Sequence, residues 1–192
     1  QENECLKHIN MNIRPGEKIA IVGNNGAGKS TLVKLLMRLY DVTDGQILLN
    51  GTDIKQINLD SYRALFGTVF QDYQVLALSV AENVLMRKCE TEEDRKIVEN
   101  ALRESGIWDK VCTFENGMDT LLTREFSDKG VILSGGEFQK IALARVFAKP
   151  CEIVILDEPS SALDPIAEYN MYENMIRACE GKIVVFISHR LS

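Results

Sequence analysis

The sequence predicts an α/β fold with a parallel sheet, and three patterns lead to that expectation. A glycine-rich loop joins an apolar strand expected over residues 18–22 to a helical run over residues 31–39. The runs 153–156 and 182–187 are apolar and rich in β-branched side chains without alternation, as in parallel strands covered on both faces. From about residue 79 to 114 the pattern is helical instead.

The glycine-rich loop has the complete phosphate-binding pattern G-x-x-x-x-G-K-[ST]. Glycines let successive backbone N–H groups approach a triphosphate, and the start of the next helix carries partial positive charge. Lys29 would reach the β- and γ-phosphates, and the Ser30 hydroxyl can ligate Mg²⁺. The sequence therefore predicts a nucleotide-binding chain whose loop consists of Gly23, Asn24, Asn25, Gly26, Ala27, Gly28, Lys29 and Ser30, followed by Thr31.

The elements before and after the loop suggest how the parallel core is elaborated. Residues 9–13 alternate between apolar and polar as a half-exposed strand does, and residues 46–49 precede the hairpin signal Asn50-Gly51. Capping patterns begin helices at Ser79 and Thr91. We therefore expect an antiparallel β subdomain, and an α-helical subdomain inserted over about residues 72–132.

The C-terminal part of the chain returns to alternating helices and strands. A helix is expected from Ser134 until Pro150 stops it, and another begins at Asp164-Pro165 and ends near Gly181. With the phosphate-binding loop upstream, this order is that of a P-loop NTPase core.

Composition excludes several other classes of protein. The chain has 192 residues, a formal net charge of −6 and no Lys/Arg-rich run, so nucleic acid is not an expected partner. Its longest aliphatic runs are far short of the ~20 residues that a membrane-spanning helix needs. Five scattered cysteines without C-x-x-C spacing are expected to be reduced packing residues.

Two carboxylates follow the apolar run at residues 153–156, where open α/β sheets place their ligands. Asp157 is the expected Mg²⁺ partner beside the β- and γ-phosphates. Glu158 is then free to polarise a water for in-line attack on the γ-phosphate. On its own this ending marks a strand-to-turn boundary, but together with the phosphate-binding loop it predicts an ATPase centre.

A second glycine-rich start occurs at Leu133-Ser134-Gly135-Gly136-Glu137. Ser134 and Glu137 have the spacing of a capping box, which alone would indicate only a well-formed helix start. Two glycines in the first turn cost stability, and they help only where something must approach the backbone. An anion at this helix N-terminus would account for them.

Taken together, these motifs resemble those of the nucleotide-binding domain of ATP-binding cassette (ABC) transporters, and the resemblance covers nearly the whole chain. The order is that of the family: phosphate-binding loop, glutamine loop with Gln71, signature, Asp157 with Glu158, a loop with Asp164, and switch His189. The resemblance implies ATP and Mg²⁺ as cofactors. It implies Glu158, His189 and Gln71 as catalytic residues, Ser30, Gln71 and Asp157 around the metal, and Asp164 at an interface between two domains.

The resemblance also implies a head-to-tail pair of domains. ATP on the phosphate-binding loop of one domain would be covered by Ser134, Gly135 and Gly136 of a second, so hydrolysis would require a homodimer or heterodimer. The other implied partner is a transmembrane domain, in the same parent chain for the exporter type, with this domain at the cytoplasmic face of the cell membrane. No aromatic residue precedes Tyr40 where the family stacks adenine, and the chain stops just after His189. We therefore expect residues 1–192 to be a fragment that lacks both ends of the domain.

The exporter type is favoured by Asp60-Ser61-Tyr62-Arg63 and Asp128-Lys129-Gly130, which are similar to exporter cassettes. Importers, soluble ABC ATPases and a catalytically silent nucleotide-binding regulator remain alternatives, and nothing in the chain identifies a cargo. Glu137, where the signature more often has Gln, is expected to have a modest effect. The apolar residues Val75, Leu76, Leu78 and Val80 either face membrane helices or belong to the core.

Overall fold

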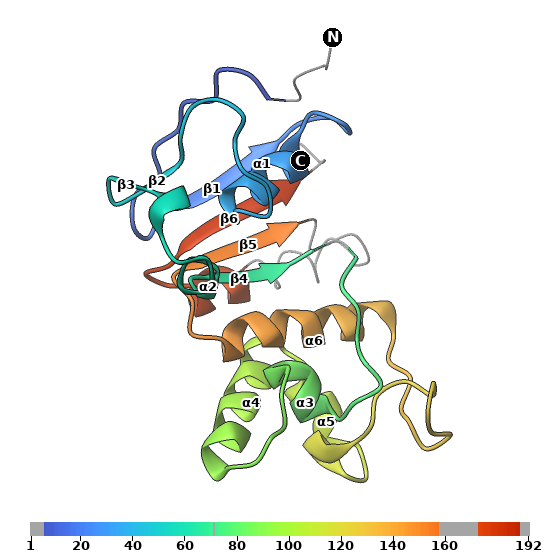
Figure 1. Cartoon of the computed structure of the whole chain (residues 1–192). Helices are drawn as coiled ribbons and strands as arrows, with labels where there is room; N and C mark the ends of the chain where they lie inside the picture. Colours follow the sequence, from blue (N-terminus) through green and yellow to red (C-terminus); the bar gives the residue numbers. More distant parts are fainter. Residues whose placement is uncertain (1–5, 71, 158–172, 189–192) are drawn as a thin grey trace. The chain divides into compact units, whose positions relative to one another are not determined.

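The computed structural model describes residues 6–70, 72–157 and 173–188 (Figure 1). The chain divides into two compact units. The first, here the sheet unit, consists of Gln1–Thr68, Cys151–Glu158 and Gly181–Ser192. The second, here the helical unit, consists of Val69–Pro150 and Pro159–Glu180.

A four-stranded sheet forms the centre of the sheet unit, with the strand order β1-β6-β5-β4 (Figure 1). β6 runs parallel to both β1 and β5. Val154, Ile155 and Val184 are at most 1% exposed, which is why these strands read as continuous apolar runs. The predicted parallel α/β core is confirmed, and its strands are β1 (Lys18–Val22), β4 (Phe66–Val69), β5 (Ile153–Asp157) and β6 (Ile183–Ser188).

A two-stranded antiparallel sheet joins β2 (Leu48–Leu49) to β3 (Thr52–Asp53). Asn50 and Gly51 both have positive φ, +50° and +83°, as a type I′ hairpin turn requires. The hairpin is therefore confirmed. The regular strand is shorter than the expected 46–49, although the N–H of Ile54 still donates to the carbonyl of Ile47 at 3.0 Å.

The strand expected over residues 9–13 does not form. Residues 6–17 contain no strand, and Ile9 and Met11 are 54% and 46% exposed. Alternation alone does not make a strand, because its backbone groups also need a hydrogen-bonded neighbour. The expectation was wrong for that reason.

Three short helical elements follow the loop in the sheet unit: α1 (Lys29–Leu36), η1 (Ile54–Gln56) and α2 (Leu59–Ala64). α1 ends three residues before the expected Leu39, because Arg38 adopts a left-handed φ of +52°. The guanidinium of Arg38 instead donates to the carbonyls of Ile54 and Ile57 at 2.9 and 2.8 Å. These bonds connect the end of α1 to η1.

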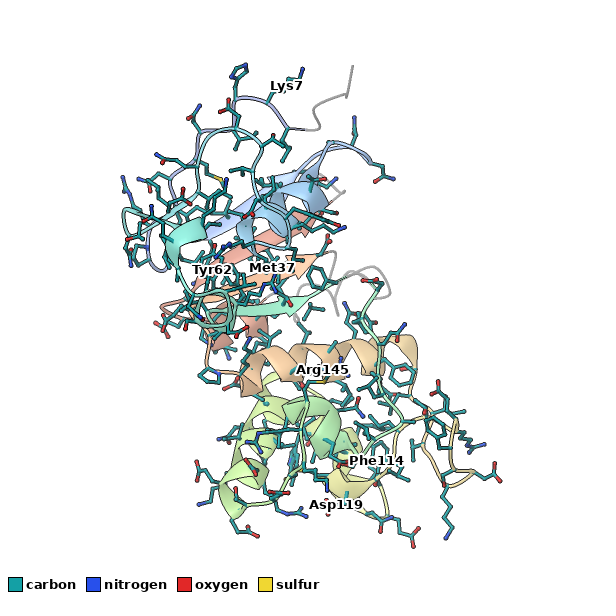
Figure 2. The ribbon with its side chains drawn as sticks, in the orientation of Figure 1. Lys7, Met37, Tyr62, Phe114, Asp119 and Arg145 are labelled. Atoms are coloured by element: carbon teal, nitrogen blue, oxygen red, sulfur yellow. The ribbon has the colours of Figure 1, made fainter. Side chains whose placement is uncertain are left out.

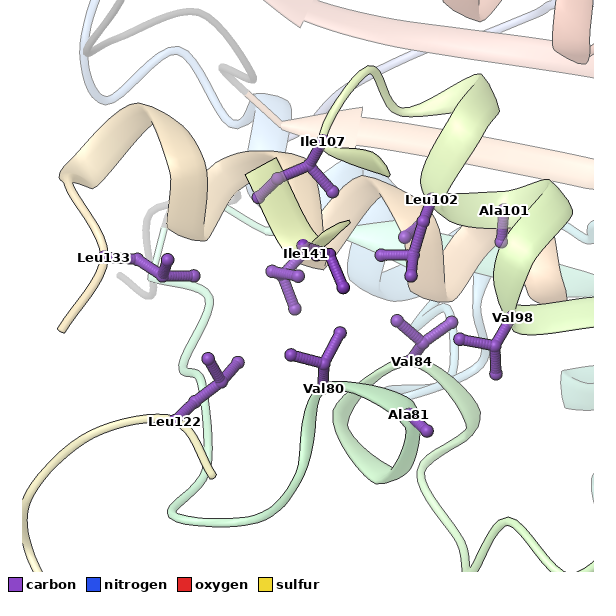
Figure 3. Packing of buried hydrophobic residues seen from close by; sticks show 12 residues of the cluster. Val80, Ala81, Val84, Val98, Ala101, Leu102, Ile107, Leu122, Leu133 and Ile141 are labelled. Carbon is purple, nitrogen blue, oxygen red and sulfur yellow. The ribbon is translucent and has the colours of Figure 1, made fainter. Parts of the chain in front are cut away.

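The helical unit packs around one apolar cluster, which Figure 3 shows from close by. Val80 from α3, Leu102 from α4 and Ile141 from α6 are completely buried in it. Val80 is therefore a core residue, whereas Leu76 and Leu78 are each 39% exposed. The elements of this unit are α3 (Val80–Leu85), α4 (Glu92–Glu104), α5 (Trp108–Cys112), η2 (Gly117–Asp119) and α6 (Gly135–Ala148), with residues 173–178 also helical.

Three helices of this unit start at reciprocal capping boxes, as the sequence predicts. They begin after Ser79, Thr91 and Ser134, each with an acidic residue three positions later. Gly106 follows α4 with φ +71°, the left-handed conformation typical of the residue that ends a helix. In the described part of the chain, every helix is too short or too polar to cross a bilayer.

Candidate functional site

The glycine-rich loop lies at the C-terminal end of β1 and leads directly into α1. Gly26 and Gly28 both have left-handed φ values, +80° and +85°. A side chain at either position would be strained, so glycine is required here by the backbone itself. Residues 24–27 are exposed at the tip of the loop. Such alternating backbone conformations turn successive N–H groups toward one point, which makes a concave site for an anion.

α1 begins without a capping side chain, because its N-cap residue is Gly28. In contrast, the three helices of the helical unit with capping boxes have an N-cap side-chain oxygen over their first turn. A helix start with a glycine N-cap leaves room for an external acceptor at its N–H groups. The exposed Ser30 lies in the same first turn, where its hydroxyl oxygen is a donor atom of the kind that Mg²⁺ prefers.

Lys29 is only 7% exposed, which is unusual for a lysine. Its Nζ donates to the carbonyl oxygens of Gly23 at 2.6 Å and Asn24 at 3.0 Å. The ammonium is thus held against the backbone of the loop, with its charge next to the anion-binding concavity. A buried cation in this place can bind a phosphate group without first losing the hydration of an exposed lysine.

Asp157 ends β5 at the same edge of the sheet as the loop. In the parallel register Asp157 is opposite Ile187 of β6, which is in turn opposite Ile21 of β1. Adjacent strands are about 4.8 Å apart, so the backbones of β1 and β5 are about 10 Å apart at this level. The sheet thus places a carboxylate and the phosphate-binding loop on one edge, as open α/β folds do. Oxygen donors from Asp157 and Ser30 fit a hard divalent cation.

The signature residues begin α6 in the helical unit. The capping box engages the N–H groups of Ser134 and Glu137, and not those of Gly135 and Gly136. A Cβ added to Gly135 would have no atom within 4 Å, so packing inside this chain does not explain the glycine. The start of α6 is exposed at Ser134 and Gly135.

Glu137 is held by its own helix. Its carboxylate accepts from the Ser134 N–H at 2.8 Å and the Ser134 Oγ at 3.0 Å, and Lys110 Nζ lies 3.6 Å away. The bond from the Ser134 N–H, followed by the hydroxyl and Lys110, holds the pKa of the Glu137 carboxyl below its ordinary value. The carboxylate is therefore ionised at neutral pH and compensated locally.

Four of the expected site residues lie outside the described residues: Gln71, Glu158, Asp164 and His189. Those described fall into two groups. The loop residues 23–31 and Asp157 belong to the sheet unit, and residues 134–136 belong to the helical unit. That these residues bind a nucleotide or a metal remains a prediction.

A polar network in the helical unit was not anticipated from the sequence. Asn83 is completely buried within α3, and Arg145 on α6 donates to it. A polar residue between apolar neighbours at each position was the available signal. Neither residue pointed to the other without the fold.

Comparison with known proteins identifies the family. The family model described as ABC transporter matches residues 6–161. The chain belongs to the ABC transporter family. Its fold is that of an ABC ATPase domain: a solved chain titled as a bacterial Atm1-family ABC exporter with ATP bound superposes over 100% of this chain with a TM-score of 0.86 and 33% identity.

Curated members of the ABC transporter family are similar over essentially the whole chain. The subtilin transport ATP-binding protein SpaT of Bacillus subtilis is 40% identical over 195 residues, which covers 100% of this chain and 31% of SpaT. The human ATP-binding cassette sub-family B member 5 is 36% identical over 189 residues, 98% of this chain and 15% of that protein. The chain thus spans about a third or less of the length of these relatives.

Proposed function

We propose that this chain is the ATP-hydrolysing domain of a membrane exporter. The observation that carries the proposal is the phosphate-binding loop on β1 and α1, with its two left-handed glycines and the buried Lys29. The two relatives and the solved exporter described above support this choice by their names and title. Fold and ATPase chemistry transfer with the motifs, whereas the cargo does not.

In this proposal the loop residues 23–31 cradle the triphosphate of ATP through their N–H groups. Lys29 neutralises charge on the β- and γ-phosphates, while Ser30, Asp157 and Gln71 hold Mg²⁺. The metal supplies Lewis-acid neutralisation of charge that develops on the phosphate oxygens. Glu158 accepts a proton from the attacking water, and His189 contacts the γ-phosphate.

Ser134, Gly135 and Gly136 would complete the site from a second domain. The support comes from the start of α6, where the box leaves the N–H groups of both glycines out and nothing packs beside Gly135. The N-terminus of a 14-residue helix attracts an anion. Asp164 would lie at the same interface. ATP then holds two domains together, and loss of the γ-phosphate lets them separate.

The remaining partner is a transmembrane domain that this domain would serve at the cytoplasmic face of a membrane. Leu76 and Leu78, half-exposed on the helical unit, are candidates for that contact. The expected domain organisation, with residues 1–192 as part of a longer polypeptide, belongs to the same proposal.

Phosphate release from ATP tests the function directly. With MgATP the chain should release phosphate, and with EDTA release should stop, because the metal neutralises the reacting phosphates. Binding without hydrolysis in the presence of Mg²⁺ would instead favour the silent regulator.

Replacing Glu137 by Gln should change the turnover by less than about tenfold, or ~1.4 kcal/mol. Glutamine keeps an oxygen that can accept from the Ser134 N–H, so the box survives the substitution. Steady-state hydrolysis of MgATP measures the effect, with the exposed Glu115→Gln as a control for charge. A change well above tenfold would show that the carboxylate itself acts on the bound nucleotide.

A further inference from the structure

The segment that follows β4 contacts the signature directly through one hydroxyl group. Tyr73 Oη donates to the carbonyl oxygen of Gly135 at 3.2 Å, although the two residues are 62 positions apart in the sequence. Both belong to the helical unit. The ring of Tyr73 is half-buried, and that burial raises the pKa of the phenol, so the hydroxyl keeps its proton at neutral pH.

A bond to the Gly135 carbonyl constrains the next N–H group. The peptide between Gly135 and Gly136 is planar and trans, so its C=O and its N–H point in opposite directions. Fixing the oxygen therefore fixes the direction of the Gly136 N–H. Glycine backbone is intrinsically the most mobile, and no atom lies within 4 Å of a Cβ built on Gly135. The Tyr73 hydroxyl supplies a restraint that side-chain packing at Gly135 does not.

The segment that carries Tyr73 is itself anchored to α6. Arg145 Nη1 donates to the carbonyl of Gln74, the next residue after Tyr73, at 2.7 Å. Arg145 Nε and Nη2 donate to the backbone and side-chain oxygens of Asn83 at 2.8 and 2.9 Å. Figure 2 labels Arg145 on α6. One guanidinium thus holds both the segment and the helix α3 that follows it.

Asn83 completes the attachment from inside the unit. Its Oδ1 accepts from the N–H of Leu76 at 2.9 Å, and its Nδ2 donates to the carbonyls of Leu76, Leu78 and Ser79 at 2.9, 3.2 and 3.0 Å. The side chain is completely buried, so losing these partners would leave unpaired polar atoms. Residues 74–79 are therefore fixed to α3 and α6, and Tyr73 lies at the start of that fixed segment.

We propose that Tyr73 is a positioning residue of the ATPase cycle: through the Gly135 carbonyl it holds the Gly136 N–H in the direction from which it meets the γ-phosphate of ATP bound to a second domain. The inference rests on the proposed function. It adds a residue that touches neither nucleotide nor metal, and it gives the Arg145 and Asn83 network the task of placing that residue.

The test is Tyr73→Phe in the complete chain, because phenylalanine keeps the ring and removes only the hydroxyl. The control is Tyr40→Phe, a hydroxyl removed from an exposed tyrosine of the sheet unit. In chain labelled with ¹⁵N-glycine, the Gly136 amide resonance should shift and its hydrogen exchange should accelerate in Tyr73→Phe alone. The turnover at saturating MgATP should fall about threefold to tenfold, while the Kd for MgATP on the phosphate-binding loop stays unchanged.

Three results separate the claims. A Gly136 amide that is unchanged, or a normal turnover beside an active wild type, would overturn the role of Tyr73. A weaker Kd for MgATP with unchanged turnover would also overturn it, because the hydroxyl would then act on binding in its own domain. If the wild type itself releases no phosphate, the proposed function fails, and the Gly136 amide still reports whether Tyr73 restrains that peptide.

Discussion

Replacing Lys29 by Met should lower the turnover of MgATP about 10²–10³-fold, the scale seen when one donor to a developing anion is removed. The side chain is 7% exposed, and its Nζ lies 2.6 Å from the Gly23 carbonyl. Methionine fills nearly the same volume without the charge, so the loss should come from the missing cation and not from a cavity. Titration with MgATP and steady-state phosphate release measure binding and turnover separately.

Lys34→Met is the matched control for Lys29→Met. It removes the same charge from the same helix α1, at an exposed position in the last turn. Thermal unfolding of both variants should resemble the wild type, because Lys29 gives up only two carbonyl partners on the loop. A Lys29→Met chain that still hydrolyses at more than a tenth of the wild-type rate would contradict the site as proposed.

Glu158→Gln should reduce hydrolysis about 10²–10⁴-fold, the usual contribution of a general base. Glutamine has the shape of glutamate but cannot take the proton of the attacking water. Binding of MgATP should be retained, because the loop residues and Lys29 are unchanged. Trapped before hydrolysis, the variant should accumulate as a dimer held by ATP, which light scattering detects as a doubled mass.

Glu152→Gln is the control for that variant, since Glu152 is exposed just before β5, at the other end of the strand that leads to Glu158. It should hydrolyse ATP at the wild-type rate. If Glu158→Gln retained its activity, the base would have to be another group. The assignment of Asp157 and Glu158 would then need revision.

Local chemistry explains why much of the fold was predictable. β1 has the expected residues 18–22, and the capping boxes after Ser79, Thr91 and Ser134 form as expected. Each depends on neighbours within four residues in the sequence, or on an apolar run long enough to be buried. The phosphate-binding loop was equally visible, because its left-handed positions require glycine.

Features that depend on distant partners were not predictable. The alternation over residues 9–13 is genuine, but without a neighbouring strand it gives an exposed extended segment. The exposure of Leu76 and the burial of Val80 followed only from how α3 packs. Most plainly, the bond from Tyr73 to Gly135 joins residues that no sequence pattern relates.

The central claim is that ATP is hydrolysed between two copies of the signature-bearing domain, and the dependence of hydrolysis on protein concentration tests it most directly. Phosphate release per molecule of chain should rise with concentration and then level off as pairs form. The mass in solution, followed by light scattering, should increase over the same range in the presence of MgATP. A rate per molecule that is constant at all concentrations, with the chain monomeric throughout, would contradict the composite site.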